Sequence, residues 1–279
     1  LDNEYYFKRP GCYGYYDDGE RFAFFSRGVM EILPFINFYP DVLHCHDWQA
    51  ALSVLYLKTI YCYRPEYQFI RALFTIHNIE YQGKYSLDIL EDLFGISNNY
   101  RYLLEYDGCL NLMKGAIECA EKFSTVSPTY AREITEPQYA FGLEELLRQR
   151  QREGRLSGIL NGVDESIWDP RSDSLLAAHY DPASLAEKAK NKQQLQTMLG
   201  LKEDARAPLF TVVSRLTSQK GLDLLLDALP GLVEQGGQLD FDGIDTASEN
   251  LLNPLILTKN ELRTQITSEI GRINQRCAG

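Results

Sequence analysis

The fold is decided by residues 41–58, which read DVLHCHDWQAALSVLYLK. Residues 41–45 are a short, mostly apolar run, which predicts a buried strand. In residues 48–58 the apolar side chains of Leu52 and Leu55 recur at helical spacing, which predicts that a helix follows the strand. A short strand that runs directly into a helix is the repeating unit of a parallel sheet.

Strand and helix patterns alternate along most of the remaining chain. Short apolar runs predict further strands at residues 72–76, 122–126, 156–160 and 208–213. Longer patterns predict helices at residues 113–121, from the capping dipeptide Ser127-Pro128 onward, at 185–199 and at 222–235. This alternation predicts an α/β fold with a Rossmann-like, doubly wound parallel sheet.

The pattern loosens over residues 161–185, where Asp, Pro and Ser accumulate. We interpret this segment as a crossover between two domains. The predicted organisation is an N-terminal lobe at residues 1–160, the crossover and the beginning of a second lobe at 161–239, and an unassigned tail at 240–279.

The tail departs from the α/β rhythm. Another apolar strand is due after Gln238, but residues 240–245 are acidic and poor in apolar side chains. We therefore predict a loop there, and an exposed sheet edge beside the strand at 208–213. A capping box at residues 258–261 then predicts an amphipathic helix with the apolar stripe Leu262, Ile266, Ile270 and Ile273.

The composition restricts the classes of function. The chain has 279 residues, 44% of them hydrophobic, and a formal net charge of −11. An acidic protein lacks the broad basic face that nucleic-acid binding requires, and no apolar run reaches the ~20 residues of a membrane span. The six cysteines have no CxxC spacing, which favours reduced thiols and a cytoplasmic location. Because the sequence lacks an initiator Met, we expect it to begin partway through a longer protein.

Two cations mark the loop after the predicted strand at 208–213. Residues 212–221 read VVSRLTSQKG, so Arg215 and Lys220 lie between a strand and a helix. Ligands of parallel sheets bind beyond the carboxyl ends of the strands, where a helix N-terminus also favours anions. The pattern favours a site for a diphosphate leaving group, and the alternative is a pair of solvated surface cations.

Histidines and an aspartate end the predicted strand at 41–45. His44 and His46 alternate along it and so share a face, and with Asp47 they suggest a metal site. Because no further ligand is obvious, we favour a polar cluster that faces a ligand cleft. The alternative is that His44 is a packed strand residue and that Asp47 caps the following helix.

Polar residues also end the predicted strand at 72–76. His77 and Asn78 offer donors and acceptors that suit sugar hydroxyls, and the alternative for His77 is a structural role. The sequence contains no GxSxG, GxGxxG or P-loop motif and no CxxC pair, so nucleophilic-serine, NTPase and zinc functions lack their usual signals.

Several segments together resemble the bacterial glycogen synthase family, the ADP-glucose-dependent glycogen/starch synthases. The matching segments are HCHDWQA at 44–50, FTIHNI at 74–79, STVSPTYAREI at 124–134, GILNGVD at 158–164 and VSRLTSQKGLD at 213–223. Their order and spacing agree with the family from about Tyr5 to Leu239.

The resemblance implies a two-lobed glycosyltransferase-B fold with its active site between the lobes. It also implies retaining transfer of glucose from ADP-glucose to the non-reducing end of an α-1,4-glucan, without a metal or other cofactor. The residues implied to be catalytic are His77 beside the transferred glucose, Asp47 in the cleft, and Arg215 and Lys220 on the diphosphate. Those implied to bind substrate are Asn78, Asn161 and Tyr13.

The resemblance further implies truncation at both ends. The family opens with a strand and a Lys-Thr-Gly-Gly-Leu loop that precede the start of this chain, and residues 240–279 do not resemble the family. We expect Asp47, His77 and the loop from Arg215 to Lys220 to face one cleft, and the chain by itself to be inactive. The alternative function is a non-catalytic glucan-binding or interaction fragment.

Overall fold

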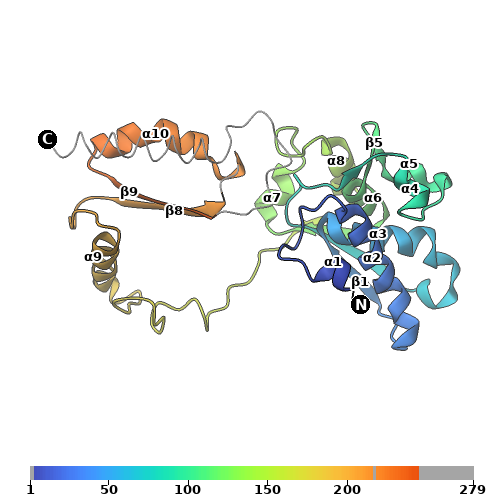
Figure 1. Cartoon of the computed structure of the whole chain (residues 1–279), viewed down its shortest axis with the longest axis horizontal. Helices are drawn as coiled ribbons and strands as arrows, with labels where there is room; N and C mark the ends of the chain where they lie inside the picture. Colours follow the sequence, from blue (N-terminus) through green and yellow to red (C-terminus); the bar gives the residue numbers. More distant parts are fainter. Residues whose placement is uncertain (1–2, 216–217, 245–279) are drawn as a thin grey trace. The chain divides into compact units, whose positions relative to one another are not determined.

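The computed structural model describes residues 3–215 and 218–244 (Figure 1). The chain divides into two compact units, residues 1–162 and 163–279. Each unit is described by itself.

A four-stranded parallel sheet forms the centre of the first unit. Its strands are β1 (Val42–His46), β2 (Arg71–Ile76), β6 (Lys122–Thr125) and β7 (Leu156–Gly158), in the order β1-β2-β6-β7. In the register of the sheet Thr75 lies beside His46 on one side and Ser124 on the other. Because all strands are parallel, their carboxyl ends lie at one edge of the sheet.

Helices and a small antiparallel sheet complete this unit. The longer helices are α2 (Asp18–Phe35), α3 (Asp47–Thr59), α6 (Leu112–Cys119) and α8 (Glu144–Arg152). The shorter ones are α1 (Glu4–Phe7), α4 (Ile89–Asp92), α5 (Arg101–Leu104) and α7 (Pro128–Glu133). The small sheet contains β3 (Lys84–Tyr85), β5 (Cys109–Asn111) and β4 (Glu105–Tyr106), in that order.

The two faces of the four-stranded sheet differ in polarity. Cys45, Phe74 and Phe123 lie side by side on one face and belong to the buried core formed with α3 and α6. The alternate residues, which include Thr75 and Ser124, lie on the opposite face. The sheet therefore presents a polar face that continues to the carboxyl ends of its strands.

The N-terminus of α7 packs closely against β7. Ser127 caps the helix, because its hydroxyl accepts hydrogen bonds from the amides of Thr129 and Tyr130 at 3.1 and 3.3 Å. The predicted helix start at Ser127-Pro128 is confirmed. A Cβ on Gly158 in β7 would lie 2.4 Å from both the carbonyl oxygen of Ser127 and the Cα of Pro128, so the strand has room only for glycine there.

Gly158→Ala is expected to lower the free energy of unfolding by about 1–3 kcal/mol, because the new methyl group meets backbone atoms that cannot rotate away. Urea unfolding followed by Trp48 fluorescence in a Trp168→Phe background measures this loss. Gly162→Ala is the matched control, because a Cβ at Gly162 meets nothing within 4 Å. Equal stability of the two variants would contradict the prediction.

Within residues 163–215 and 218–244, the second unit contains one longer helix and one strand–helix–strand unit. Its elements are α9 (Lys188–Met198), β8 (Leu209–Arg215), α10 (Leu222–Glu234) and β9 (Gln238–Ile244). β8 and β9 pair in parallel, and α10 lies along this pair (Figure 1). Gln196 of α9 donates to the side chain of Gln238 at 2.6 Å, which ties the helix to the start of β9.

The strand β9 corrects the prediction for the tail. Residues 238–244 form a strand in register with β8 from Leu209↔Gln238 to Arg215↔Ile244, so the predicted loop and the exposed edge on this side of β8 are wrong. The backbone supplies the ladder hydrogen bonds whatever the side chains are, and Leu239, Asp240, Phe241 and Asp242 alternate with the period of a strand. The predicted capping box and apolar stripe of residues 258–273 lie outside the described residues.

Candidate functional site

Asp47, the first residue of α3, occupies an unusual backbone position directly after β1. Its φ angle is +52°, in the left-handed region that few residues other than glycine adopt. Its Oδ1 accepts hydrogen bonds from the backbone amides of His77 at 2.7 Å and Asn78 at 3.4 Å. The alternative in which Asp47 caps α3 is therefore wrong, because the carboxylate binds the neighbouring loop instead.

The carboxylate of Asp47 is partly shielded from solvent. Burial raises its pKa above the ordinary value, and the hydrogen bonds from His77 and Asn78 offset part of that rise. The left-handed backbone of Asp47 is strained. Such strain persists only where the surrounding structure holds it, and it concentrates at functional sites.

The loop that follows β2 is held at several further points. The amide of Ile79 donates to the Tyr130 hydroxyl at 3.1 Å, and the amide of Glu80 donates to Asn78 Oδ1 at 3.0 Å. Gly83 ends the loop with a φ of +65°, and a Cβ there would lie 2.8 Å from the Trp48 ring. A loop tied down in this way presents fixed groups to a ligand, which reduces the cost of ordering them on binding.

Three histidines gather where β1 and β2 end. The rings of His44 and His46 lie 4.2 Å apart between centroids, which confirms the prediction that they share a face. His46 Nδ1 lies 3.0 Å from Nε2 of His77, and His44 Nε2 lies 2.8 Å from the Thr75 hydroxyl.

The polar cluster extends into the sheet. The Thr75 hydroxyl also lies 2.8 Å from that of Ser124, so hydrogen bonds continue from β1 across β2 to β6. His46 was predicted only as part of the polar cluster with His44 and Asp47, and Thr75 and Ser124 were not among the predicted site residues. The signal that identifies them is the alternation of polar residues on one face of adjacent parallel strands.

The remaining candidates of the first unit belong to other segments of the chain. Asn161 is exposed beyond the end of β7, which is three strand spacings or about 14 Å across the sheet from β1. Tyr13 is 48% exposed in the segment between α1 and α2. The structure thus brings together Asp47, His77 and Asn78, and the roles of Asn161 and Tyr13 stay predictions.

The two cations belong to the second unit. Arg215 is the last residue of β8, and Lys220 is exposed at the end of a 3-10 turn (Ser218–Lys220) that leads into α10. Gly221 takes a φ of +65° between this turn and the helix. Because Asp47 and Lys220 lie in different units, the shared cleft stays a prediction.

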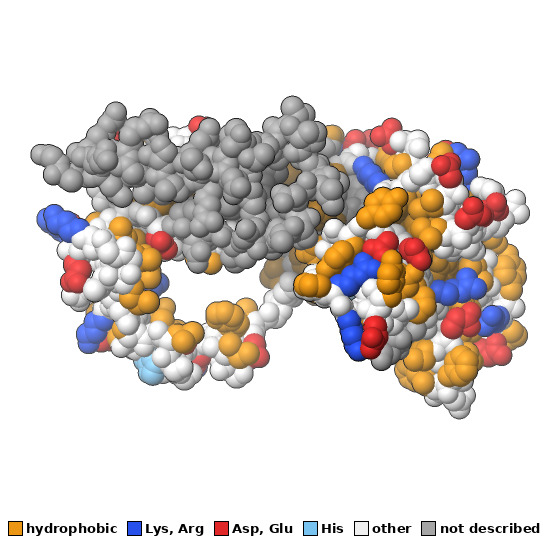
Figure 2. Space-filling model, in the orientation of Figure 1, with side chains coloured by type: hydrophobic (Ala, Val, Ile, Leu, Met, Phe, Trp, Pro, Cys, Tyr) orange, Lys and Arg blue, Asp and Glu red, His pale blue; other side chains and the backbone are white. Residues whose placement is uncertain are grey.

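Within residues 3–215 and 218–244, no three His, Cys, Asp or Glu side chains are grouped so that they could hold a metal ion. The cysteines of these ranges, Cys12, Cys45, Cys62, Cys109 and Cys119, are free thiols. On the face of residues 3–162 that Figure 2 presents, basic, acidic and apolar side chains are interspersed rather than gathered into one broad basic area.

Acid is expected to destabilise the first unit through its histidines. Burial and the neighbouring rings lower the pKa of His44 and His46 below their ordinary 6.5. The unfolded chain therefore takes up protons first, so the free energy of unfolding should fall as the pH drops through about 6.5. The raised pKa of Asp47 has the opposite effect, but at more acidic pH.

Urea midpoints at pH 7.5 and 5.5 measure this fall, and a His44→Gln variant should show a smaller one. If the variant and the parent chain responded identically to pH, the assignment of the effect to this cluster would fail.

Comparisons with known proteins agree with the fold and with the predicted family. Residues 1–149 match the family described as "Starch synthase catalytic domain". The glycogen synthase of Alkaliphilus metalliredigens (strain QYMF) is 45% identical over 241 residues, which are 86% of this chain and 50% of that protein. The chain belongs to the starch synthase catalytic domain family.

A solved structure extends the likeness to three dimensions. The catalytic domain of Starch Synthase IV from Arabidopsis thaliana, bound to ADP and acarbose, matches 84% of this chain and 48% of its own length. The TM-score is 0.74 at 35% sequence identity. The predicted α/β fold with a parallel sheet and the predicted family are confirmed. The chain spans about half the length of these relatives.

No helix within the described ranges is both long enough and apolar enough to span a bilayer.

Proposed function

We propose that this protein is a glycogen or starch synthase. It transfers glucose from ADP-glucose to the non-reducing end of an α-1,4-glucan, with retention of configuration, and it works in the cytoplasm without a metal or other cofactor. Membership of the family and the 45% identity to a bacterial glycogen synthase support this proposal. The ADP and acarbose of the Arabidopsis relative are ligands of the kind the reaction requires.

The observation that carries the proposal is the pair of hydrogen bonds that Asp47 accepts from the loop after β2. Its carboxylate holds the backbone amides of His77 and Asn78 in place, so the polar end of β2 has a fixed geometry. In the proposed reaction His77 and Asp47 line the pocket of the transferred glucose, where polar groups fixed in advance stabilise the charge that develops.

The remaining candidates supply the leaving-group and substrate contacts. Arg215 and Lys220 hold the diphosphate, because fixed cations favour the departure of an anionic leaving group. Asn78, Asn161 and Tyr13 bind the sugar substrates. Neither a nucleic acid nor a membrane has a part in this scheme.

The test is a hybrid enzyme. The 241-residue matched stretch of the Alkaliphilus glycogen synthase is replaced by the corresponding stretch of this chain. The hybrid should elongate glycogen with labelled glucose from ADP-glucose, and the same hybrid with His77→Ala should not. A folded hybrid without activity would contradict the proposal.

The 279-residue chain alone should transfer no glucose above a heat-killed control, because this chain spans only half of the relatives' length.

A second candidate function is a glucan-binding fragment without catalysis. The exposed aromatic side chains near the N-terminus favour it, since Tyr5 is 68% exposed and Tyr16 is fully exposed. Retention of the 279-residue chain on amylose, lost in a Tyr5→Ser/Tyr16→Ser variant, would support this function. Transfer by the hybrid would show that catalysis accompanies it.

A further inference from the structure

His77 is held by two consecutive residues of another element. Its backbone amide donates to Asp47 Oδ1 at 2.7 Å, and its ring nitrogen Nε2 lies 3.0 Å from Nδ1 of His46. His46 ends β1 and Asp47 begins α3, so one short junction fixes both the backbone and the ring of His77. The two rings lie 5.2 Å apart between centroids, at an interplanar angle of 46°.

The contact between the two rings fixes a protonation pattern. A neutral imidazole carries one N–H and one lone pair, so a hydrogen bond between Nδ1 of His46 and Nε2 of His77 contains one proton. Whichever ring donates, Nε2 of His77 is engaged by β1. The nitrogen of His77 that remains for a ligand is Nδ1.

We infer that His46 is a positioning residue for His77, which holds the direction of its ring, couples its protonation to that of His46 and leaves Nδ1 as the ligand-facing nitrogen. This inference rests on the proposed function for its meaning in catalysis, although the hydrogen bond itself does not depend on activity. His46 and His77 are both exposed, and an exposed ring keeps several rotamers unless a partner holds it. Holding the ring before substrate arrives removes an ordering cost from the binding step.

Nuclear magnetic resonance of the 279-residue chain tests the inference directly. The chain has only four histidines, so the ring nitrogens of each can be assigned in long-range proton–nitrogen spectra. At pH 7.5 the His77 ring should show one protonated and one unprotonated nitrogen, and Nδ1 of His46 should have the complementary state to Nε2 of His77. Two protonated or two unprotonated nitrogens at this contact in the parent chain would overturn the inference.

Two variants separate positioning from a general structural role. His46→Ala removes the partner, so the population of the held His77 ring rotamer should fall roughly fivefold relative to the others, the ratio that corresponds to one hydrogen bond of ordinary net strength. His46→Asn places an amide near the position of Nδ1 and should restore much of this rotamer preference. A His77 spectrum that did not change in His46→Ala would overturn the inference.

The controls lie in the same spectra. His44→Ala removes a ring that contacts His46 but bonds to Thr75, so the pattern of His77 should persist. His179 lies in the second unit, near the carbonyl oxygen of Asp173, and should be unchanged in every variant. An unchanged backbone amide spectrum shows that each variant is folded. Because no step measures glucose transfer, failure of this inference is distinct from failure of the proposed function.

Discussion

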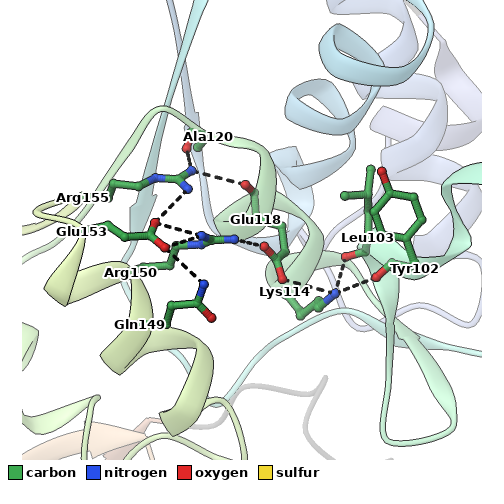
Figure 3. A network of polar contacts seen from close by, with 9 residues as sticks. All are labelled: Tyr102, Leu103, Lys114, Glu118, Ala120, Gln149, Arg150, Glu153 and Arg155. Carbon is green, nitrogen blue, oxygen red and sulfur yellow. Dashed lines mark hydrogen bonds and ion pairs between the residues drawn. The ribbon is translucent and has the colours of Figure 1, made fainter.

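Glu118→Ala is expected to lower the free energy of unfolding of the first unit by about 3 kcal/mol, near the lower end of the range for breaking a buried ion pair. Glu118 lies on α6 between two cations. Its carboxylate forms an ion pair with Lys114 at 3.5 Å, and it binds the guanidinium of Arg150 on α8 (Figure 3). Removing it leaves both charges in surroundings where water reaches them poorly.

The size of this effect follows from burial and from the partners that remain. The side chains of Lys114, Arg150 and Glu118 are only 10%, 14% and 22% exposed. In the variant, Lys114 still donates to the carbonyl oxygens of Tyr102 and Leu103, at 2.8 and 2.9 Å. Arg150 still forms its ion pair with Glu153 at 2.8 Å (Figure 3). These contacts reduce the loss and set the estimate at the lower end of the range.

Urea unfolding, with Trp48 as reporter in a Trp168→Phe background, measures the loss. Glu145→Ala is the matched control, because Glu145 pairs with Arg148 at 3.1 Å but is 78% exposed. Such an exposed pair contributes less than about 1 kcal/mol. If the two substitutions had the same effect, burial would not be what makes the Glu118 network stabilising.

The four strands of the parallel sheet in the first unit follow from the sequence, whereas the small antiparallel sheet and the central contact of the site do not. β1 and β2 are short apolar runs, and local composition is enough to predict them. The bond from His77 to Asp47 joins residues 30 positions apart and depends on the register of two strands. An aspartate before a helix usually caps it, so the sequence favours a local partner over the one observed.

The second unit shows the same difference between local and distant information. The amphipathic helix α10 was predicted from its own pattern, and Pro230 lies inside it. The strand β9 was missed because a rule that requires a continuous apolar run rejects a segment in which acidic residues alternate with apolar ones along the sequence. Pairing with β8 makes residues 240–243 a strand, although their side chains do not predict one.

The roles of Arg215 and Lys220 have a different basis. Position at the end of a strand and before a helix makes an anion site plausible, and only the resemblance to the synthases selects a diphosphate. The first unit gives no information on them, because they lie in the second. A functional measurement on Lys220 is therefore the decisive one for this part of the proposal.

Lys220→Ala is expected to lower kcat in the hybrid synthase by roughly 100-fold or more, equivalent to about 3 kcal/mol of barrier, while the fold stays intact. Lys220 is exposed and lies before the helix α10, so its removal leaves no cavity. In the proposed function, what is lost is a fixed positive charge beside the leaving diphosphate. Arg215→Lys should also lower kcat, because a point charge does not replace the two parallel hydrogen bonds of a guanidinium.

Initial rates at saturating ADP-glucose measure the effect, since a role in the chemical step lowers kcat and not only the affinity for the donor. Lys202→Ala is the matched control, because Lys202 is an exposed lysine of the same unit that is not part of the loop between β8 and α10. It should leave kcat unchanged. Lys220→Arg keeps the charge and should recover part of the activity. Full turnover by Lys220→Ala at saturating donor would remove Lys220 from the catalytic residues and leave it a solvated cation at the start of α10.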